Sequence, residues 1–264
     1  MYRQLPDRVA AAAYVVLVLS ISLGTAGIAG GLLLAVSPAL VTLLMLVVVS
    51  REGWTRDGWA RLGLGRLGLR GWPGALAATL GVNVLAVAAV VAAGCARYSA
   101  PDGGWWQDLL ALCVSGPILA FAEELGWRGY LQPRLSFLGE RAAMLVIGLV
   151  WFAWHLPYIL LTPYYHADGN RAVVLALFGG SVIAFSFLFG YLRAVSRSLW
   201  PAVLGHFAHN ASFAWLAAYA ISTDRPVVVN EYLAGDTGLF VLVGTVACAT
   251  AMGVRRRAAT SARR

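Results

Sequence analysis

The chain has 264 residues, of which 60% are hydrophobic and 12% are charged, and its mean hydropathy is +0.74. A soluble domain carries about 25% charged residues, so these values exclude a soluble globular protein and require lipid as the solvent for much of the chain. The formal net charge is +8. The arginines that produce it lie between apolar segments, where they set membrane orientation and meet anionic headgroups, so we expect no nucleic acid partner.

Apolar segments follow one another along the chain and predict about eight membrane-spanning helices of roughly 20 residues each. They cover residues 9–27, 30–50, 72–94, 106–131, 141–161, 172–193, 199–221 and 237–254. The N-terminal apolar pattern continues without a convincing cleavage site, so the first segment is predicted to be an uncleaved span. No soluble linker interrupts the chain. Residues 1–264 are therefore predicted to form a single all-α, polytopic membrane domain.

The boundary between the first two segments has two candidate positions. The stretch GTAGIAGG, residues 24–31, is rich in glycine and is the favoured break. The dipeptide Ser37-Pro38 is the alternative, because proline removes a helix hydrogen bond. In the favoured case, Pro38 lies inside the second helix.

The arginines between the segments are distributed unequally. With the N-terminus in the cytoplasm, the cytoplasmic segments hold all but three of the 20 arginines, with Arg3, Arg263 and Arg264 among them. The opposite side holds Arg97, Arg171 and Arg225. Because positive charge collects on the cytoplasmic side of membrane proteins, both termini are predicted to be cytoplasmic. Residues 61–72, RLGLGRLGLRGW, are predicted to form a short amphipathic segment at the membrane interface.

Two adjacent carboxylates, Glu123 and Glu124, end the fourth apolar segment, and Arg128 follows one helical turn later. A charged side chain at the bilayer centre costs at least about 2.5–3.5 kcal/mol, so it needs a partner or a wet cavity. Glu124 and Arg128 are four residues apart and are expected to pair. Glu123 points about 100° away and is left to face a cavity. The alternative is a helix end at the interface, which explains Arg128 better than it explains two adjacent glutamates.

The fifth and seventh segments carry the other unusual polar side chains. His155 is the only ionisable group within LVWFAWHLPY, where a lone histidine is usually a hydrogen-bonded packing residue. His206 and Asn210 are four residues apart and share a helix face, with His209 on a flanking face. Two histidines and an asparagine in one span are unusual, since a structural histidine needs no asparagine one turn away.

These side chains together suit hydrolysis. A carboxylate can take a proton from water, and an imidazole can orient that water or carry the proton to a leaving amine. A second imidazole and a carboxamide can donate hydrogen bonds to the oxyanion of a tetrahedral intermediate. The sequence contains no GxSxG, no Ser–Lys pair, no HExxH and no P-loop motif. A serine or P-loop mechanism therefore has no support.

Three motifs on successive membrane segments resemble those of the CPBP family, which comprises CAAX-processing and bacteriocin-processing intramembrane proteases and is also called the Abi or type II CAAX prenyl endopeptidase family. They are EELGWR (Glu123 to Arg128), WFAWH (Trp151 to His155) and HFAHN (His206 to Asn210). RGYLQPRL after the acidic pair resembles the usual continuation. The resemblance predicts a catalytic helical core over residues 105–215. One departure is Trp151, at a position where phenylalanine is commoner.

The resemblance implies a role for each motif residue. Glu123 would activate water, with His155 as its partner. His206 and Asn210 would form the oxyanion side, and Glu124 and Arg128 would hold the fourth helix in register. Glu123, His155 and His206 also resemble the ligand set of a catalytic zinc site. We favour a mechanism without a metal cofactor, because HExxH, which supplies a separate glutamate base beside the zinc ligands, is absent.

The expected activity is therefore cleavage of a membrane-associated protein or peptide by a glutamate-type endopeptidase. The enzyme is expected to be embedded in the lipid bilayer. The expected location is the cytoplasmic membrane of a bacterium, with the active site open to the cytoplasm. Two other classes remain. A bacteriocin immunity or binding protein could use the same scaffold without cutting. A transporter also places polar groups at mid-membrane, but no inverted repeat supports it. The natural substrate and the oligomeric state have no signal in the sequence.

Overall fold

The computed structural model describes residues 5–261, so Arg3, Arg263 and Arg264 lie outside the described residues. The structure is 79% helical, which confirms the all-α class. The α-helices are α1 (Asp7–Thr25), α2 (Leu32–Leu44), α3 (Arg56–Ala60), α4 (Trp72–Ala78), α5 (Leu80–Ala92), α6 (Trp105–Glu124), α7 (Gln132–Arg134), α8 (Glu140–Leu161), α9 (Arg171–Ser196), α10 (Trp200–Tyr219) and α11 (Leu239–Ser261).

Shorter 3₁₀ and π segments connect or extend these helices. They are η1 (Ile28–Gly31), η2 (Met45–Val49), η3 (Glu52–Trp54), η4 (Leu69–Gly71), η5 (Leu125–Leu131), η6 (Ser136–Leu138) and η7 (Val227–Leu233). Two short strands, β1 (Arg97–Tyr98) and β2 (Ile221–Ser222), pair antiparallel in the described chain.

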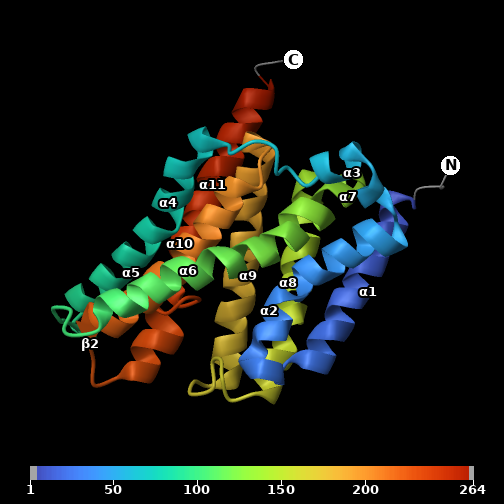
Figure 1. The fold of residues 1–264 in the computed structure, drawn as a ribbon. Coiled ribbons are helices and arrows are strands. Elements are labelled where there is room, and N and C mark those ends of the chain that lie inside the picture. Colours follow the sequence, from blue (N-terminus) through green and yellow to red (C-terminus); the bar gives the residue numbers. More distant parts are fainter. Residues whose placement is uncertain (1–4, 262–264) are drawn as a thin grey trace.

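Each predicted segment is helical in the described part of the chain, and η4, α4 and α5 together form the third (Figure 1). Seven helices of that part are long and apolar enough to cross a membrane. The helix α10 is not among them: it has 20 residues but carries His206, His209 and Asn210, which lower its hydropathy. The chain is thus an integral, multi-pass membrane protein, and its seventh predicted segment depends on packing against α4, α5, α6 and α9.

The favoured break between the first two segments is confirmed. Ala29, Gly30 and Gly31 have φ values of 50°, 64° and 89°, so the chain turns sharply at η1. A Cβ on Gly31 would lie 2.6 Å from the ring of Tyr158, and this close approach requires glycine. Pro38 lies inside α2, whose helix continues to Leu44.

One end of the bundle joins segments that are far apart in the sequence, and both termini lie at this end (Figure 1). The N-terminus of α1, residues 51–71, η5 to α8, the α9–α10 connection and the end of α11 meet there. The contacts are Arg61–Asp7 (2.8 Å), Arg134–Glu52 (2.5 Å), the Leu199 amide to the Gly63 carbonyl (3.0 Å) and Arg256–Glu140 (2.6 Å). These are the segments predicted to share the cytoplasmic side.

The opposite end joins the connections predicted to lie on the other side. β1 follows α5 and pairs with β2, which follows α10. The loop of residues 162–170 contacts η7 through a hydrogen bond from His166 Nδ1 to Glu231 Oε2, 2.6 Å long. The alternating course predicted from the arginines is therefore present in the fold.

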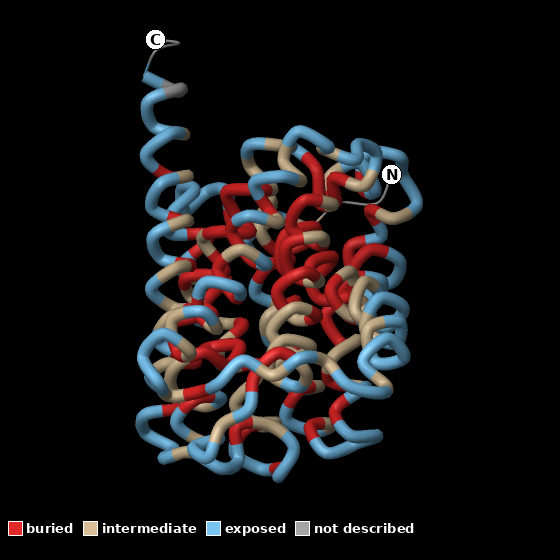
Figure 2. Tube along the Cα trace, turned by 90° about the vertical axis from the view of Figure 1, so that its left-hand side faces the viewer, coloured by how far each residue is buried: buried red, intermediate tan, exposed pale blue. Residues whose placement is uncertain are grey.

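The helix α9 is the most enclosed of the candidate spans. Its most apolar window is 56% buried, against 22–39% for the other six in the described chain. It packs against α8, α10 and α11, and buried residues concentrate in the middle of the bundle (Figure 2). The motif-bearing helices α8 and α10 therefore lie beside the most enclosed candidate span of the described chain, and α10 also packs against α6.

Candidate active site

Glu123 is the penultimate residue of α6 and is 8% exposed. The indole Nε1 of Trp151, on α8, donates a hydrogen bond of 2.9 Å to Glu123 Oε2. The other oxygen, Oε1, makes no hydrogen bond within the described residues and lies 4.0 Å from His206 Nε2. One carboxylate oxygen is thus fixed, and the other is left for a ligand or a water molecule.

Glu124 is fully buried and lies at the centre of a charged network. Its Oε1 accepts a hydrogen bond from Arg128 Nη1 at 2.8 Å and one from His206 Nδ1 at 2.9 Å. The pairing of Glu124 with Arg128 follows the spacing predicted from the sequence. Arg128 also donates to the Phe185 carbonyl at 3.4 Å and lies over the Trp151 ring, 4.6 Å from its centroid. This network joins α6, η5, α8, α9 and α10.

His206 lies between the two adjacent carboxylates. Because a carboxylate only accepts, Nδ1 carries a proton toward Glu124, and Nε2 is directed toward Glu123. The ring stacks on Phe189 of α9, with centroids 5.6 Å apart and planes inclined by 18°. The arrangement of carboxylate, imidazole and second carboxylate orients His206 in the way that a triad aspartate orients its histidine.

His155 is half-buried, and its Nδ1 lies 3.0 Å from the Trp151 carbonyl oxygen. A carbonyl only accepts, so Nδ1 holds the proton and Nε2 is an acceptor in the neutral ring. The ring packs against Trp154, Phe178 and Tyr165. Within the described residues, His155 makes no hydrogen bond to Glu123; Trp151 is the direct partner on α8.

The two remaining polar residues of α10 have different surroundings. Asn210 is half-buried, and its side chain makes no hydrogen bond within the described chain. His209 is 5% exposed, its ring lies 4.3 Å from that of Phe185, and its Nδ1 has no partner there. The His209 carbonyl accepts a hydrogen bond from Asn83 Nδ2 at 2.9 Å. The structure thus brings Glu123, Glu124, Arg128 and His206 into contact, with His155 and Asn210 at the edges.

Sequence reasoning missed three features of this region. Trp151 was predicted only as an aromatic residue, not as a donor to Glu123. Asn83 is buried in α5 and also donates to Ser212 Oγ at 2.7 Å, which fixes α10. A lone asparagine inside an apolar span was the available signal for it.

The third feature is a polar cluster at the end of the bundle opposite the termini. His166 Nδ1 donates to Glu231, and Tyr165 donates to Asp236. Burial raises the pKa of Tyr165 well above its usual range, and the nearby Asp236 carboxylate raises it further. The phenol therefore stays protonated as a donor. Its ring lies 6.3 Å from that of His155, so this cluster supports the half-buried face of the site.

The alternative zinc set of Glu123, His155 and His206 can be tested against the geometry. Among the residues that the structure describes, no three His, Cys, Asp or Glu side chains converge closely enough to hold a metal ion. His206 Nδ1 is occupied by Glu124, Glu123 Oε2 by Trp151, and His155 Nδ1 by a carbonyl group. The three free atoms do not form a ligand set in this arrangement.

Comparison with known proteins supplies an independent result. The sequence model of the type II CAAX prenyl endopeptidase Rce1-like family matches residues 104–212. The matched region begins at the N-cap of α6 and ends within α10, so it includes all three motifs. None of the curated proteins matches the chain. Residues 104–212 are therefore similar to the Rce1-like type II CAAX prenyl endopeptidases, and this similarity supports the resemblance that the three motifs carry.

Proposed function

We propose that the chain is a glutamate-type endopeptidase that hydrolyses a peptide bond of a membrane-associated protein or peptide. The observation that carries the proposal is the division of labour between the adjacent carboxylates. Glu124 is held by Arg128 and His206, whereas Glu123 keeps Oε1 uncommitted. With His206 doubly protonated, the two carboxylates, Arg128 and His206 sum to zero charge. A buried group of this kind is stable only when its charges balance.

The reaction begins with a water molecule between Glu123 and His155. Glu123 Oε1 takes one proton, while His155 Nε2 accepts a hydrogen bond from the other. The hydroxide oxygen attacks the carbonyl carbon of the scissile peptide bond. Negative charge then develops on the carbonyl oxygen, where His206 Nε2–H and the Asn210 amide donate hydrogen bonds. The carbon–nitrogen bond breaks as Glu123 returns its proton to the leaving amine, which restores the carboxylate.

This mechanism uses no metal cofactor. The absence of a three-ligand arrangement among the described residues supports that choice, as does the absence of HExxH from the sequence. We further propose that the site opens toward the cytoplasm of a bacterial cell. Glu123 lies near the C-terminal end of α6, which is directed toward the arginine-rich end of the bundle that holds both termini. This position supports a site that opens toward the cytoplasm.

The activity is tested by labelling new protein N-termini in the membranes of cells that express the chain or its Glu123→Gln variant. We expect specific new N-termini that disappear in the variant. The loss should be at least about 100-fold, the usual contribution of a general base. Glu140→Gln, which changes an acidic residue at the start of α8, serves as the matched control and should cleave normally.

The same comparison separates a protease from a binding or immunity protein. If Glu123→Gln folds and leaves the pattern of N-termini unchanged, the endopeptidase proposal is wrong. An immunity phenotype that survives Glu123→Gln would then identify a binding function. Folding of the variant is checked by its melting temperature in detergent.

A further inference from the structure

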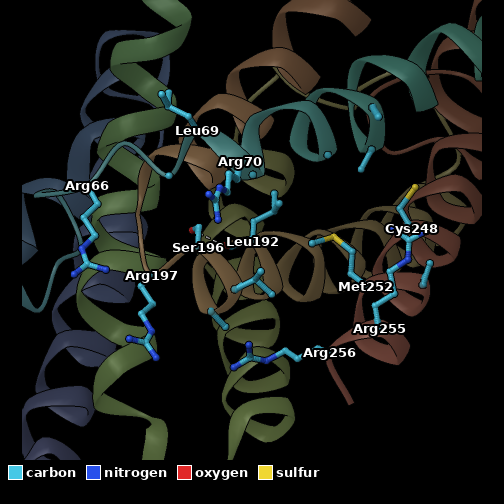
Figure 3. A pocket seen from close by; sticks show the side chains of 18 of the residues that line it. Arg66, Leu69, Arg70, Leu192, Ser196, Arg197, Cys248, Met252, Arg255 and Arg256 are labelled. Carbon is cyan, nitrogen blue, oxygen red and sulfur yellow. Dashed lines mark hydrogen bonds between the residues drawn. The ribbon is translucent and has the colours of Figure 1, made fainter. Parts of the chain in front are cut away.

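A cavity lies outside the candidate active site. It has a volume of about 1540 Å³ and opens at the end of the bundle that holds the termini. Its walls are the loop and helix of residues 66–78, the last turn of α9 and residues 248–256 of α11 (Figure 3). None of the motif residues lines it. The candidate active site therefore does not account for this cavity.

Arginines surround this cavity. The five that line it are Arg66, Arg70, Arg197, Arg255 and Arg256, and no aspartate or glutamate does. In the view of Figure 3, Arg66 and Arg197 lie on one flank, Arg255 lies on the other, and Arg70 and Arg256 lie between them. Arg256 is held by Glu140 at 2.6 Å. The other four are exposed and form no ion pair with the described residues, so the rim carries positive charge that no carboxylate compensates.

The remaining walls are apolar. Leu67, Leu69 and Val195 are 55%, 59% and 62% exposed, and Leu192 and Met252 line the interior. Glycine keeps the space open: a Cβ on Gly74 would meet nothing within 4 Å. Residues 66–71, within the predicted interfacial segment, thus form one rim of the cavity. A guanidinium rim above an apolar wall matches a ligand with an anionic head and a hydrocarbon tail.

We propose that this cavity binds an anionic phospholipid. Its phosphate would be held by rim arginines such as Arg70 and Arg197, because one guanidinium group donates two parallel hydrogen bonds to phosphate oxygens. Its acyl chain would lie along Leu192 and Met252. A lipid surface is the source that fits, since the cavity opens at the membrane interface of a multi-pass protein and a soluble anion would leave the apolar wall uncovered.

Such a lipid would act on the helices that carry the site. The rim contacts the N-terminus of α10: the Arg66 carbonyl accepts from Ser198 Oγ, and the Leu64 carbonyl accepts from Trp200 Nε1 at 3.1 Å. Gly71 packs against Pro201. Neutralising the arginines would therefore hold the ends of α9, α10 and α11 together. The proposal does not depend on protease activity.

The test is native mass spectrometry of delipidated protein in detergent, titrated with phosphatidylglycerol or with phosphatidylcholine of the same acyl chains. We expect phosphatidylglycerol to bind at least about tenfold more tightly. Arg70→Gln/Arg197→Gln should weaken that binding at least about fivefold. Arg97→Gln/Arg225→Gln removes two exposed arginines at the opposite end and is the matched control, with an expected change below about twofold.

Two further binding measurements test the proposal if the arginine variant folds poorly. Gly74→Leu fills the cavity where space is open, and it should reduce phosphatidylglycerol binding without removing a charge. Glycerophosphoglycerol, the headgroup without acyl chains, should not compete at equal concentration. Equal binding of the two lipids, or undiminished binding by both the arginine and the glycine variants, would overturn the proposal. Full competition by the soluble headgroup would assign the cavity to a soluble anion instead.

Discussion

Glu124 accepts hydrogen bonds from two cationic or ionisable side chains, whereas Glu123 accepts one from the neutral indole of Trp151. Replacing Glu124 by glutamine strands the buried guanidinium of Arg128 without a carboxylate. Breaking a buried pair from one side costs about 3–5 kcal/mol. We expect Glu124→Gln to lower the melting temperature and the yield of folded protein, measured by fluorescence-detected gel filtration in detergent.

Glu123→Gln is the matched comparison for that variant. A glutamine there can still accept from Trp151, and loss of one proton from His206 restores the charge balance of the buried group, so the fold should keep its stability while cleavage is lost. Glu124→Gln/Arg128→Met removes both partners and should recover part of the stability lost in the single variant, because no lone charge is left buried. A stable Glu124→Gln protein with full activity contradicts the structural role of this pair.

The proposed metal-free site predicts the response to chelation. Dialysis against a strong chelator should leave cleavage within about twofold, because no step draws on a metal-bound water. Elemental analysis of the purified protein should show no stoichiometric zinc. The opposing result is a protein with about one zinc per chain that is inactive when stripped and is revived by zinc alone. That result would assign Glu123, His155 and His206 as ligands.

The hydrogen-bond partners of His206 and Trp151 could not be predicted from the sequence, whereas that of Arg128 could. The spacing of Glu124 and Arg128 predicts their pairing, since four residues make one turn of a helix. The hydrogen bond from His206 to Glu124 joins residues 82 positions apart, and that from Trp151 to Glu123 joins residues 28 apart. Local periodicity carries no information about such pairs, which depend on how α6, α8 and α10 cross.

Among the elements, η5 differs most from its prediction. The fourth apolar segment was predicted to be a continuous helix through residue 131, but residues 125–131 form a π-helical segment with every residue buried. Such π segments occur often at functional sites. Gly126 lies in it, and its added Cβ would be 2.6 Å from Pro38 Cβ and closer still to the Tyr14 hydroxyl. The π segment depends on this tertiary contact, which no local pattern encodes.

A single methyl group tests the importance of that contact. Gly126→Ala should destabilise the protein by about 1–3 kcal/mol through overpacking against α1 and α2, and it should displace the adjacent acidic pair. Gly129→Ala is the control within the same segment, because its Cβ would have an ordinary contact of 3.5 Å with Leu125. Melting temperatures of both variants in detergent measure the difference. Equal stability would show that α1 and α2 do not constrain η5.

For the whole molecule, the arginine distribution predicted which segments share an end, and the fold joins them there. The prediction succeeded because charge placement reflects topology directly. The cavity between α4, α9 and α11 had no sequence signal, since its lining comes from three separate stretches of chain. The apolar segments also predicted α10 as a span like the others, although α10 is not among the seven described helices that are long and apolar enough to cross a membrane.

The absolute orientation follows from the same asymmetry. The end that holds residues 51–71 and both described termini should face the cytoplasm, and the 162–170 loop should face the outside. Gly65→Cys and Asp168→Cys test this in a background without Cys95, Cys113 and Cys248. Both positions are exposed, and a Cβ at Gly65 would meet nothing within 4 Å, so neither change should disturb the fold. On intact cells, an impermeant maleimide should label only position 168, and position 65 should react after the cells are opened. Labelling of position 65 on intact cells would show that the orientation is the reverse of the one predicted. Glu123 would then lie near the outer face, and the substrate would have to come from outside the cell.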